Sequence, residues 1–128
     1  PKDIENSQCV LVRRDTREKI FVSLDNIAEE IAKLLDVIHD AMYNRALENM
    51  KAKTFEARTY DEFLTTAKET PGFIKAMWCG DSACEDQLKD ETGGVKSRCI
   101  PFEEEHLADT CVCCGKPAKH MVFWGKQY

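Results

Sequence analysis

"CVCCGKPAKH", residues 111–120, places three cysteines within four positions and follows them with glycine, lysine and proline. A second pair of cysteines stands upstream in "CGDSAC", residues 79–84, with C-x4-C spacing. Cysteines at such spacings form hairpin-like metal knuckles, in which a glycine after the last cysteine lets the chain turn tightly around the ion. The two motifs therefore predict two halves of one metal site, with the ligands Cys79, Cys84, Cys111 and Cys114.

Zinc is the metal that this ligand set favours. Four thiolates bind Zn²⁺ tetrahedrally and leave no open position for water or substrate, so the predicted role of the ion is structural. Iron in a rubredoxin-like site stays an alternative, because thiolate tetrahedra accept either metal. A thiol–disulfide redox pair is less favoured, because a redox C-x2-C motif opens a helix and here Lys116-Pro117 follow the glycine.

The sequence has seven cysteines, so three are left over. Cys113 is either surplus or an alternative ligand, and with Cys111 it would form a C-x-C pair; the C-x2-C-G knuckle favours Cys111 with Cys114. Cys9 and Cys99 fall within strand patterns, where we expect buried, inert thiols.

Two histidines, His106 and His120, flank the second knuckle and could replace a cysteine. A surface or packed histidine is far commoner than a ligand where four cysteines already suffice. We therefore expect neither to bind the metal.

Composition limits the remaining possibilities. The chain has 128 residues, a net charge of −5, 32% charged and 43% hydrophobic residues, which predicts a soluble globular protein of one or two small domains. No apolar run approaches the roughly eighteen residues of a membrane span, and an acidic balance disfavours a broad DNA-binding surface. An odd cysteine count without a signal peptide indicates a reducing compartment. The first residue is not methionine, and we expect a fragment of a longer chain.

The first part of the chain predicts a hairpin followed by a long helix. Residues 8–23 form two β-branched runs around a polar turn at residues 15–18. From residue 24 to about 50 there is no glycine or proline, and Ser23 or Asp25 could cap a helix there. Apolar residues recur in it at three- and four-residue spacing and predict a face packed in a core: Ile27, Ile31, Leu34, Leu35, Ile38 and Met42.

The second part predicts the order β-α-β-α-β-β. Strands are expected at residues 54–60, 73–78, 97–102 and 120–125, and helices from a capping box at residues 59–62 to Pro71-Gly72 and over residues 82–92. An α+β domain with both helices on one face of a mixed sheet fits this order. A unit of about 80 residues is small enough to need stabilisation beyond its hydrophobic core, which metal-binding cysteines could supply.

Catalytic motifs are missing from the sequence, which has no G-x-x-x-x-G-K-[ST] loop, G-x-G-x-x-G or G-x-S-x-G. The acidic residues are expected on solvated faces and loops. A basic hairpin in an otherwise acidic chain is the one candidate for phosphate contacts, with ordinary solvent-facing charge as the alternative: Arg13, Arg14, Arg17 and Lys19.

Three stretches resemble a known family. Residues 1–31, "PKDIENSQCVLVRRDTREKIFVSLDNIAEEI", resemble the last part of the anticodon-binding domain of class II aminoacyl-tRNA synthetases. "MWCGDSACEDQLKDETGGVKSRCIPF", residues 77–102, and "CVCCGKPAKHMVFWGKQY", residues 111–128, resemble the zinc-binding C-terminal domain of archaeal/eukaryotic-type prolyl-tRNA synthetases. The resemblance implies an α+β chain in two parts. Residues 1–50 would be the truncated end of an α/β anticodon-binding domain, and residues 51–128 a small, two-layer zinc-binding β-α-β-α-β-β domain.

What the resemblance implies about function goes further. Members of the family are cytoplasmic homodimers that activate proline with ATP and magnesium and attach it to tRNA(Pro), in a catalytic domain upstream of this region. The fragment alone is then inactive and contributes one structural zinc, held by four cysteines that match Cys79, Cys84, Cys111 and Cys114. Lys19 and Arg14 become tRNA-contact candidates, and the terminal carboxylate of Tyr128 is expected to approach the catalytic domain. The alternative is a stand-alone zinc-stabilised protein or RNA interaction module without enzymatic activity.

Overall fold

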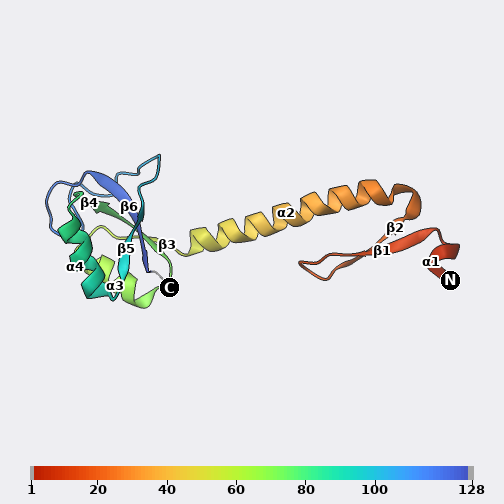
Figure 1. The fold of residues 1–128 in the computed structure, drawn as a ribbon, viewed down its shortest axis with the longest axis horizontal. Coiled ribbons are helices and arrows are strands. Elements are labelled where there is room, and N and C mark those ends of the chain that lie inside the picture. Colours follow the sequence, from red (N-terminus) through yellow and green to blue (C-terminus); the bar gives the residue numbers. More distant parts are fainter. Residues whose placement is uncertain (1, 127–128) are drawn as a thin grey trace. The chain divides into compact units, whose positions relative to one another are not determined.

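The computed structural model describes residues 2–126, which fold as two compact units divided between residues 49 and 50 (Figure 1). The role expected for Tyr128 therefore lies outside the described residues. The first unit contains α1 (Lys2–Glu5), β1 (Gln8–Val12), β2 (Lys19–Ser23), a 3-10 turn (Leu24–Asn26) and most of α2 (Ile27–Ala52). The second contains β3 (Thr54–Glu56), α3 (Tyr60–Glu69), β4 (Phe73–Trp78), α4 (Ser82–Thr92), β5 (Val95–Cys99) and β6 (His120–Lys126).

The hairpin predicted for residues 8–23 is confirmed. β1 and β2 pair antiparallel from Gln8 opposite Ser23 to Val12 opposite Lys19. The backbone N–H of Arg13 donates to Glu18 across the turn, and Arg17 adopts a positive φ of 67° there. The short helix α1, which the sequence did not predict, precedes this hairpin.

The long helix begins three residues later than expected. Ser23 caps a 3-10 turn, because its Oγ accepts the N–H of Asp25 at 3.3 Å, and α2 follows at Ile27. The predicted core packing of its apolar face is wrong: none of the 26 residues of α2 is buried, and Ile31, Leu35 and Met42 are exposed. A two-stranded hairpin of five-residue strands offers too little surface to cover a helix of this length.

The second unit is built on a mixed four-stranded sheet in the order β3-β4-β6-β5. β3 runs parallel to β4, and β6 pairs antiparallel with both β4 and β5. The predicted order β-α-β-α-β-β is confirmed, but β5 spans Val95–Cys99 instead of residues 97–102. Pro101 has no N–H to donate to the β6 ladder, which is consistent with the earlier end.

Helices α3 and α4 are fixed by local capping signals. Thr59 and Glu62 form the predicted capping box at the start of α3. The side chain of Asp81 accepts the N–H of Ala83 at the start of α4, and Gly93 ends that helix with a left-handed φ of 68°. Such a conformation favours glycine because a Cβ would be strained there.

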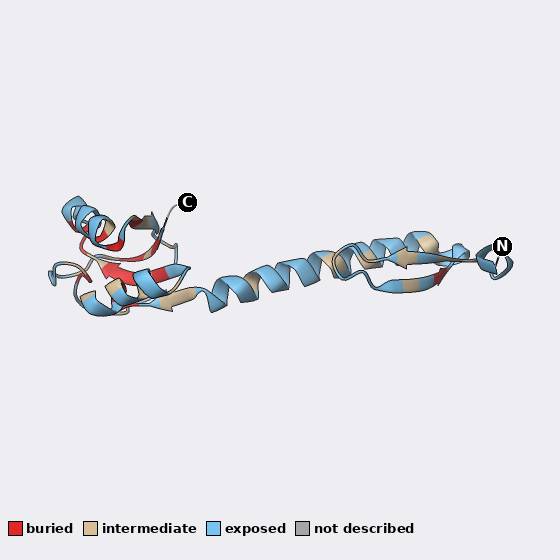
Figure 2. Ribbon diagram, turned by 90° about the horizontal axis from the view of Figure 1, so that it is seen from below, coloured by how far each residue is buried: buried red, intermediate tan, exposed pale blue. Residues whose placement is uncertain are grey.

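The core of the second unit lies between these helices and one face of the sheet. Phe63 of α3 and Leu88 of α4 are fully buried against residues that alternate along the two central strands, namely Ile74, Ala76, Val122 and Trp124. The Trp124 ring meets Phe63 edge-on at 5.6 Å and Trp78 at 6.1 Å. Apart from Val22 of β2, the buried residues among those described lie in this unit, as Figure 2 shows. Both helices thus pack on a single sheet face, as the sequence predicted.

Neither strand cysteine is the buried thiol that was expected. Cys99 is exposed, and Cys9 is only partly buried. A β-bulge explains the exposure of Cys99, because Ser97 pairs with Trp124 while Cys99 pairs with Phe123, leaving Arg98 as an extra residue. A bulge turns the following side chain to the other sheet face, which in this unit is the face away from α3 and α4.

Candidate metal centre

Two loops at one end of the sheet carry the predicted ligands. Cys79 follows β4 directly, and Cys84 lies in the first turn of α4. Cys111 and Cys114 lie in the loop before β6, which docks on the end of β4 through backbone bonds from Val112 N–H to the Met77 carbonyl (2.9 Å) and from Lys119 N–H to Trp78 (2.8 Å). The fold therefore brings together cysteines from segments that are far apart in the chain.

The four sulfur atoms have the spacing of a metal tetrahedron. Sγ atoms of Cys79, Cys84, Cys111 and Cys114 all lie within 4.8 Å of one another, and the pairs Cys79–Cys84 and Cys79–Cys114 are 3.7 Å apart. A tetrahedron with Zn–S bonds of about 2.3 Å has edges of about 3.8 Å, whereas a disulfide bond is about 2.0 Å long. All seven cysteines are free thiols. The donor set thus fits a tetrahedral thiophilic ion.

Backbone N–H groups support the sulfurs in the same way in both loops. The N–H of Asp81 points to the thiol of Cys79, and the N–H of Lys116 to that of Cys114, each two residues after the cysteine. Gly80 and Gly115, between these pairs, have positive φ values of 88° and 70°. The repeated geometry is that of two metal knuckles, and the glycines allow the turns.

The local environment shifts the pKa values of the cysteine thiols in different directions. Burial raises the pKa of Cys84 and of Cys79, because a thiolate loses its hydration there. The N–H of Lys116 stabilises the thiolate of Cys114 and lowers its pKa to about 7. Buried thiolates need a compensating cation, so a bound metal would supply the charge that this site requires.

Cys113 lies beside the four-cysteine set but does not belong to it. Its side chain packs against Cys79, Cys84 and Cys111, and its thiol donates to Oε1 of Gln87 at 3.5 Å. Burial raises its pKa. Within the described residues, the set that converges contains Cys111 and Cys114, as the knuckle spacing favours, and not the C-x-C pair.

The histidines are engaged elsewhere. His106 contacts the Asp109 carboxylate at 2.9 Å, and His120 contacts Glu104 at 3.3 Å. Neither belongs to the converging set found among residues 2–126. The C-x2-C segment is also not at the start of a helix, as a redox motif would be.

The basic hairpin is less cationic than its composition indicated. The Arg13 guanidinium forms an ion pair with Asp15 at 2.8 Å, and this contact raises the pKa of Arg13 and lowers that of Asp15. Arg14, Arg17 and Lys19 are exposed. Of the four basic residues, Arg13 is thus neutralised within the turn.

A polar cluster that the sequence analysis missed joins α3, α4 and the second knuckle. The Tyr60 hydroxyl donates to the Glu91 carboxylate, Gln87 donates to Glu91 at 3.0 Å and to Tyr60 at 3.1 Å, and Cys113 donates to Gln87. The i, i+4 spacing of Gln87 and Glu91 was the available signal, but only tertiary packing brings Tyr60 to them.

The sequence of residues 60–128 matches a family model described as "Prolyl-tRNA synthetase, C-terminal". The match covers more than half of the chain and includes all four converging cysteines. This chain belongs to the prolyl-tRNA synthetase C-terminal family. Kinship with a synthetase favours a synthetase fragment over a stand-alone module without enzymatic kinship.

Curated relatives of the prolyl-tRNA synthetase family match the whole chain. A proline–tRNA ligase of Clostridium novyi (strain NT) is 61% identical over all 128 residues, and one of Lachnospira eligens is 58% identical. Proline–tRNA ligase 2 of Bacillus thuringiensis subsp. konkukian is 56% identical. The chain spans 27%, 26% and 27% of these relatives' lengths, about a quarter of each. Among the described residues no helix is both long and apolar enough to cross a membrane.

Proposed function

We propose that this chain is the C-terminal region of an enzyme that activates proline with ATP and attaches it to tRNA(Pro). The observation that carries the proposal is the 61% identity to a proline–tRNA ligase over all 128 residues. In such an enzyme the proline carboxylate attacks ATP to give prolyl-adenylate and pyrophosphate, and the 3′ end of the tRNA then displaces AMP. ATP and magnesium would act in the region upstream of these residues, and the 128-residue chain alone would be inactive.

Residues 51–128 would brace the enzyme through one structural zinc ion. Cys79, Cys84, Cys111 and Cys114 would hold it, which is supported by the 3.7 Å sulfur spacings and the N–H groups of Asp81 and Lys116. Four thiolates complete the coordination shell, so the ion would tie two loops together and would activate neither water nor substrate. Zinc is favoured over iron because it is the common ion of such structural sites.

Residues 1–50 would be the end of the anticodon-binding domain, with Lys19 and Arg14 as tRNA contacts. Both side chains are exposed, whereas Arg13 is neutralised by Asp15. Further features that we propose for the whole enzyme are the archaeal/eukaryotic type, a homodimer, a cytoplasmic location and a Tyr128 carboxylate near the catalytic domain. The cysteine knuckles and the strand "HMVFWGK" before the terminal tyrosine support the proposed type.

The test is aminoacylation by the full-length protein. With ATP and magnesium, it should transfer labelled proline to tRNA(Pro), and alanine or cysteine at the same concentration should give far less charged tRNA. Failure to charge tRNA with proline would refute the proposed activity.

The tRNA contact has its own test in the full-length enzyme. Lys19→Ala should raise the KM for tRNA(Pro) and leave the KM for proline unchanged, because a phosphate contact affects only tRNA binding. Lys33→Ala is the control, because Lys33 is an exposed lysine already paired with Glu29 and Glu30. An unchanged KM for tRNA in Lys19→Ala would exclude the contact.

A further inference from the structure

The sheet of the second unit has a second face, opposite the one on which α3 and α4 pack. Residues facing it alternate with the core residues, so Phe73, Lys75 and Phe123 point away from α3 and α4. They line an open groove with a volume of about 500 Å³ together with Arg98 and Cys99 of β5, residues of β3 and the last turn of α2. Every strand of the sheet thus contributes to the groove.

Two local features, a β-bulge and a glycine, shape the groove. The bulge in β5 brings the consecutive residues Arg98 and Cys99 to the groove, which a regular strand could not do. Gly125 lies beneath Phe73, where an added Cβ would come within 3.2 Å of the ring. Phe73 in turn meets Phe123 edge-on at 6.5 Å. The aromatic wall therefore depends on a residue without a side chain.

Two of the cations that line the groove are engaged by neighbouring groups. Lys75 forms ion pairs with Glu56 at 3.2 Å and with Glu105 at 2.7 Å. Arg98 donates to the backbone carbonyl of Gly125 through Nε at 3.0 Å and Nη2 at 2.7 Å. Lys51 also lines the groove, but with Lys75 and Arg98 engaged the groove offers mainly aromatic rings and aliphatic stems. Such a surface suits an apolar occupant better than an anion.

At this end of the sheet face, large apolar side chains are exposed to solvent. Phe73 is 43% exposed, whereas Met77 and Met121, farther along the same face, are buried. Contiguous exposed apolar patches mark interaction sites in folded proteins. About three quarters of the length of each relative lies outside the region that matches this chain, so an enzyme of that length has ample chain to cover the groove.

We propose that the Phe73–Phe123 groove is an interface within one polypeptide, occupied by apolar side chains from the part of the synthetase upstream of residue 1. This inference rests on the proposed function only in requiring that upstream part. It assigns to the outer sheet face the task of holding the zinc-binding unit against the rest of the enzyme.

Cys99 is a native reporter of this interface, because it lines the groove and is exposed in the 128-residue chain. In the full-length protein, iodoacetamide should alkylate Cys99 at least about tenfold more slowly than in the same protein unfolded in guanidinium, as read from the mass of its peptide. Equal rates in the native and unfolded protein would overturn the proposal.

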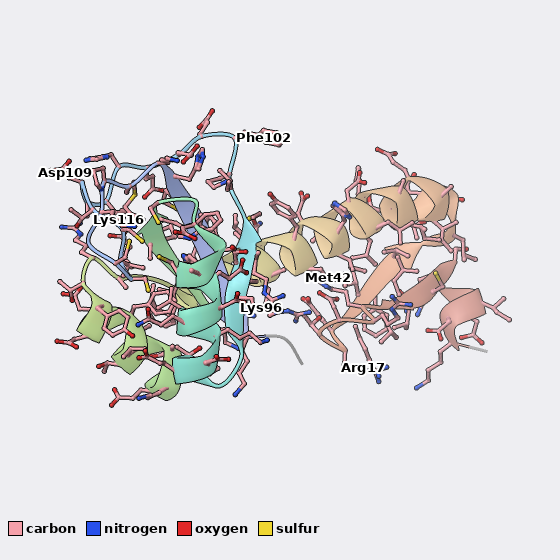
Figure 3. All side chains as sticks on the ribbon, turned by 60° about the vertical axis from the view of Figure 1, so that its left-hand side comes forward. Arg17, Met42, Lys96, Phe102, Asp109 and Lys116 are labelled. Carbon is pink, nitrogen blue, oxygen red and sulfur yellow. The ribbon has the colours of Figure 1, made fainter. Side chains whose placement is uncertain are left out.

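Two substitutions distinguish a specific effect on the groove from a general effect of adding a charge to the unit. In the full-length protein, Phe73→Asp should restore fast alkylation of Cys99, and Phe102→Asp should not. Phe102 makes a matched control because it is fully exposed, does not line the groove and points away from the unit in Figure 3. Equal Cys99 rates in both variants would contradict the proposal. If Phe73→Asp fails to fold, the wild-type rate still decides the question.

Photo-crosslinking identifies the occupant. Benzoylphenylalanine at position 73 of the full-length protein should crosslink to a peptide upstream of residue 1. Mixing normal and nitrogen-15-labelled chains distinguishes contacts within one chain from contacts between copies, and a crosslink of mixed mass would replace our occupant with a second copy. Proline charging is measured on the same preparation, so loss of the proposed function and loss of this interface give separate results.

Discussion

The sulfur atoms of Cys79 and Cys114 lie 3.7 Å apart although 35 positions separate them in the chain. The contact closes a loop that contains α4, β5 and the long connection to β6. Thiolates at this distance repel one another unless a cation lies between them. The folding of this unit and its metal content should therefore be coupled.

Replacing one of the converging cysteines should abolish metal binding. Cys114→Ser should reduce the metal content from about one ion per chain to almost none, because three thiolates and a hydroxyl hold zinc poorly. Cys113→Ser is the matched control, since Cys113 is adjacent but outside the set. Elemental analysis of protein purified without added metal makes the measurement. Retention of the ion in Cys114→Ser and its loss in Cys113→Ser would reverse the assignment.

Removing the metal should unfold the second unit selectively. Both tryptophans of the chain, Trp78 and Trp124, lie in this unit and contact each other. A strong chelator should therefore shift their fluorescence to longer wavelength, and added zinc should reverse the shift, because the binding energy of a structural metal is folding energy. An unchanged emission spectrum in fully metal-free protein would show that the ion does not stabilise the core.

Removing a buried phenylalanine should destabilise the second unit far more than removing an exposed one. Phe63→Ala should lower the free energy of unfolding by about 3–5 kcal/mol, because the fully buried ring packs against Trp124 and its loss leaves a cavity. Phe102→Ala removes the same atoms from a fully exposed site and should change stability by less than about 0.5 kcal/mol. Chemical denaturation followed by tryptophan fluorescence measures both. Similar losses in the two variants would contradict the assigned core.

The connection between β5 and β6 should loosen in acid through Glu104. The backbone N–H of Met121 donates to this carboxylate at 2.7 Å, and with His120 it lowers the Glu104 pKa below 4.5. A depressed folded-state pKa stabilises the fold above the unfolded value, and that contribution is lost as pH falls through the folded pKa. Glu104→Gln should therefore destabilise the unit at pH 7 and flatten the fall in stability below about pH 4.5. Parallel pH profiles for wild type and variant would exclude this linkage.

The first unit should associate as its concentration rises. β1 and β2 form a two-stranded sheet, so both have an unpaired edge, and Val12 and Phe21 are exposed on them. Sedimentation velocity of the 128-residue chain should show a growing dimer fraction, and Val12→Lys should reduce it by adding charge at the edge. A monomer at every concentration would rule out this pairing.

Local signals in the sequence determined most of the elements and the ligand set. The capping box at Thr59 and Glu62, the glycine after α4 and the alternation in β4 and β6 act within a few residues, so they can be identified without a fold. The C-x4-C and C-x2-C-G spacings similarly indicated which sulfurs converge. The sequence predicts these features correctly because backbone geometry over one turn depends little on distant contacts.

Tertiary structure alone decided what lies on each side of the sheet. The bulge at Arg98 turned Cys99 outward, and the pairing of β4 with β6 placed Phe73 beside Phe123. Both features depend on strand pairs whose residues lie tens of positions apart in the chain. The apolar face of α2 has the pattern of a packed helix, yet none of its residues is buried, because burial requires a partner surface, which periodicity cannot supply. Sequence patterns fix which atoms can bury or bind, and only the assembled fold determines which of them have a neighbour.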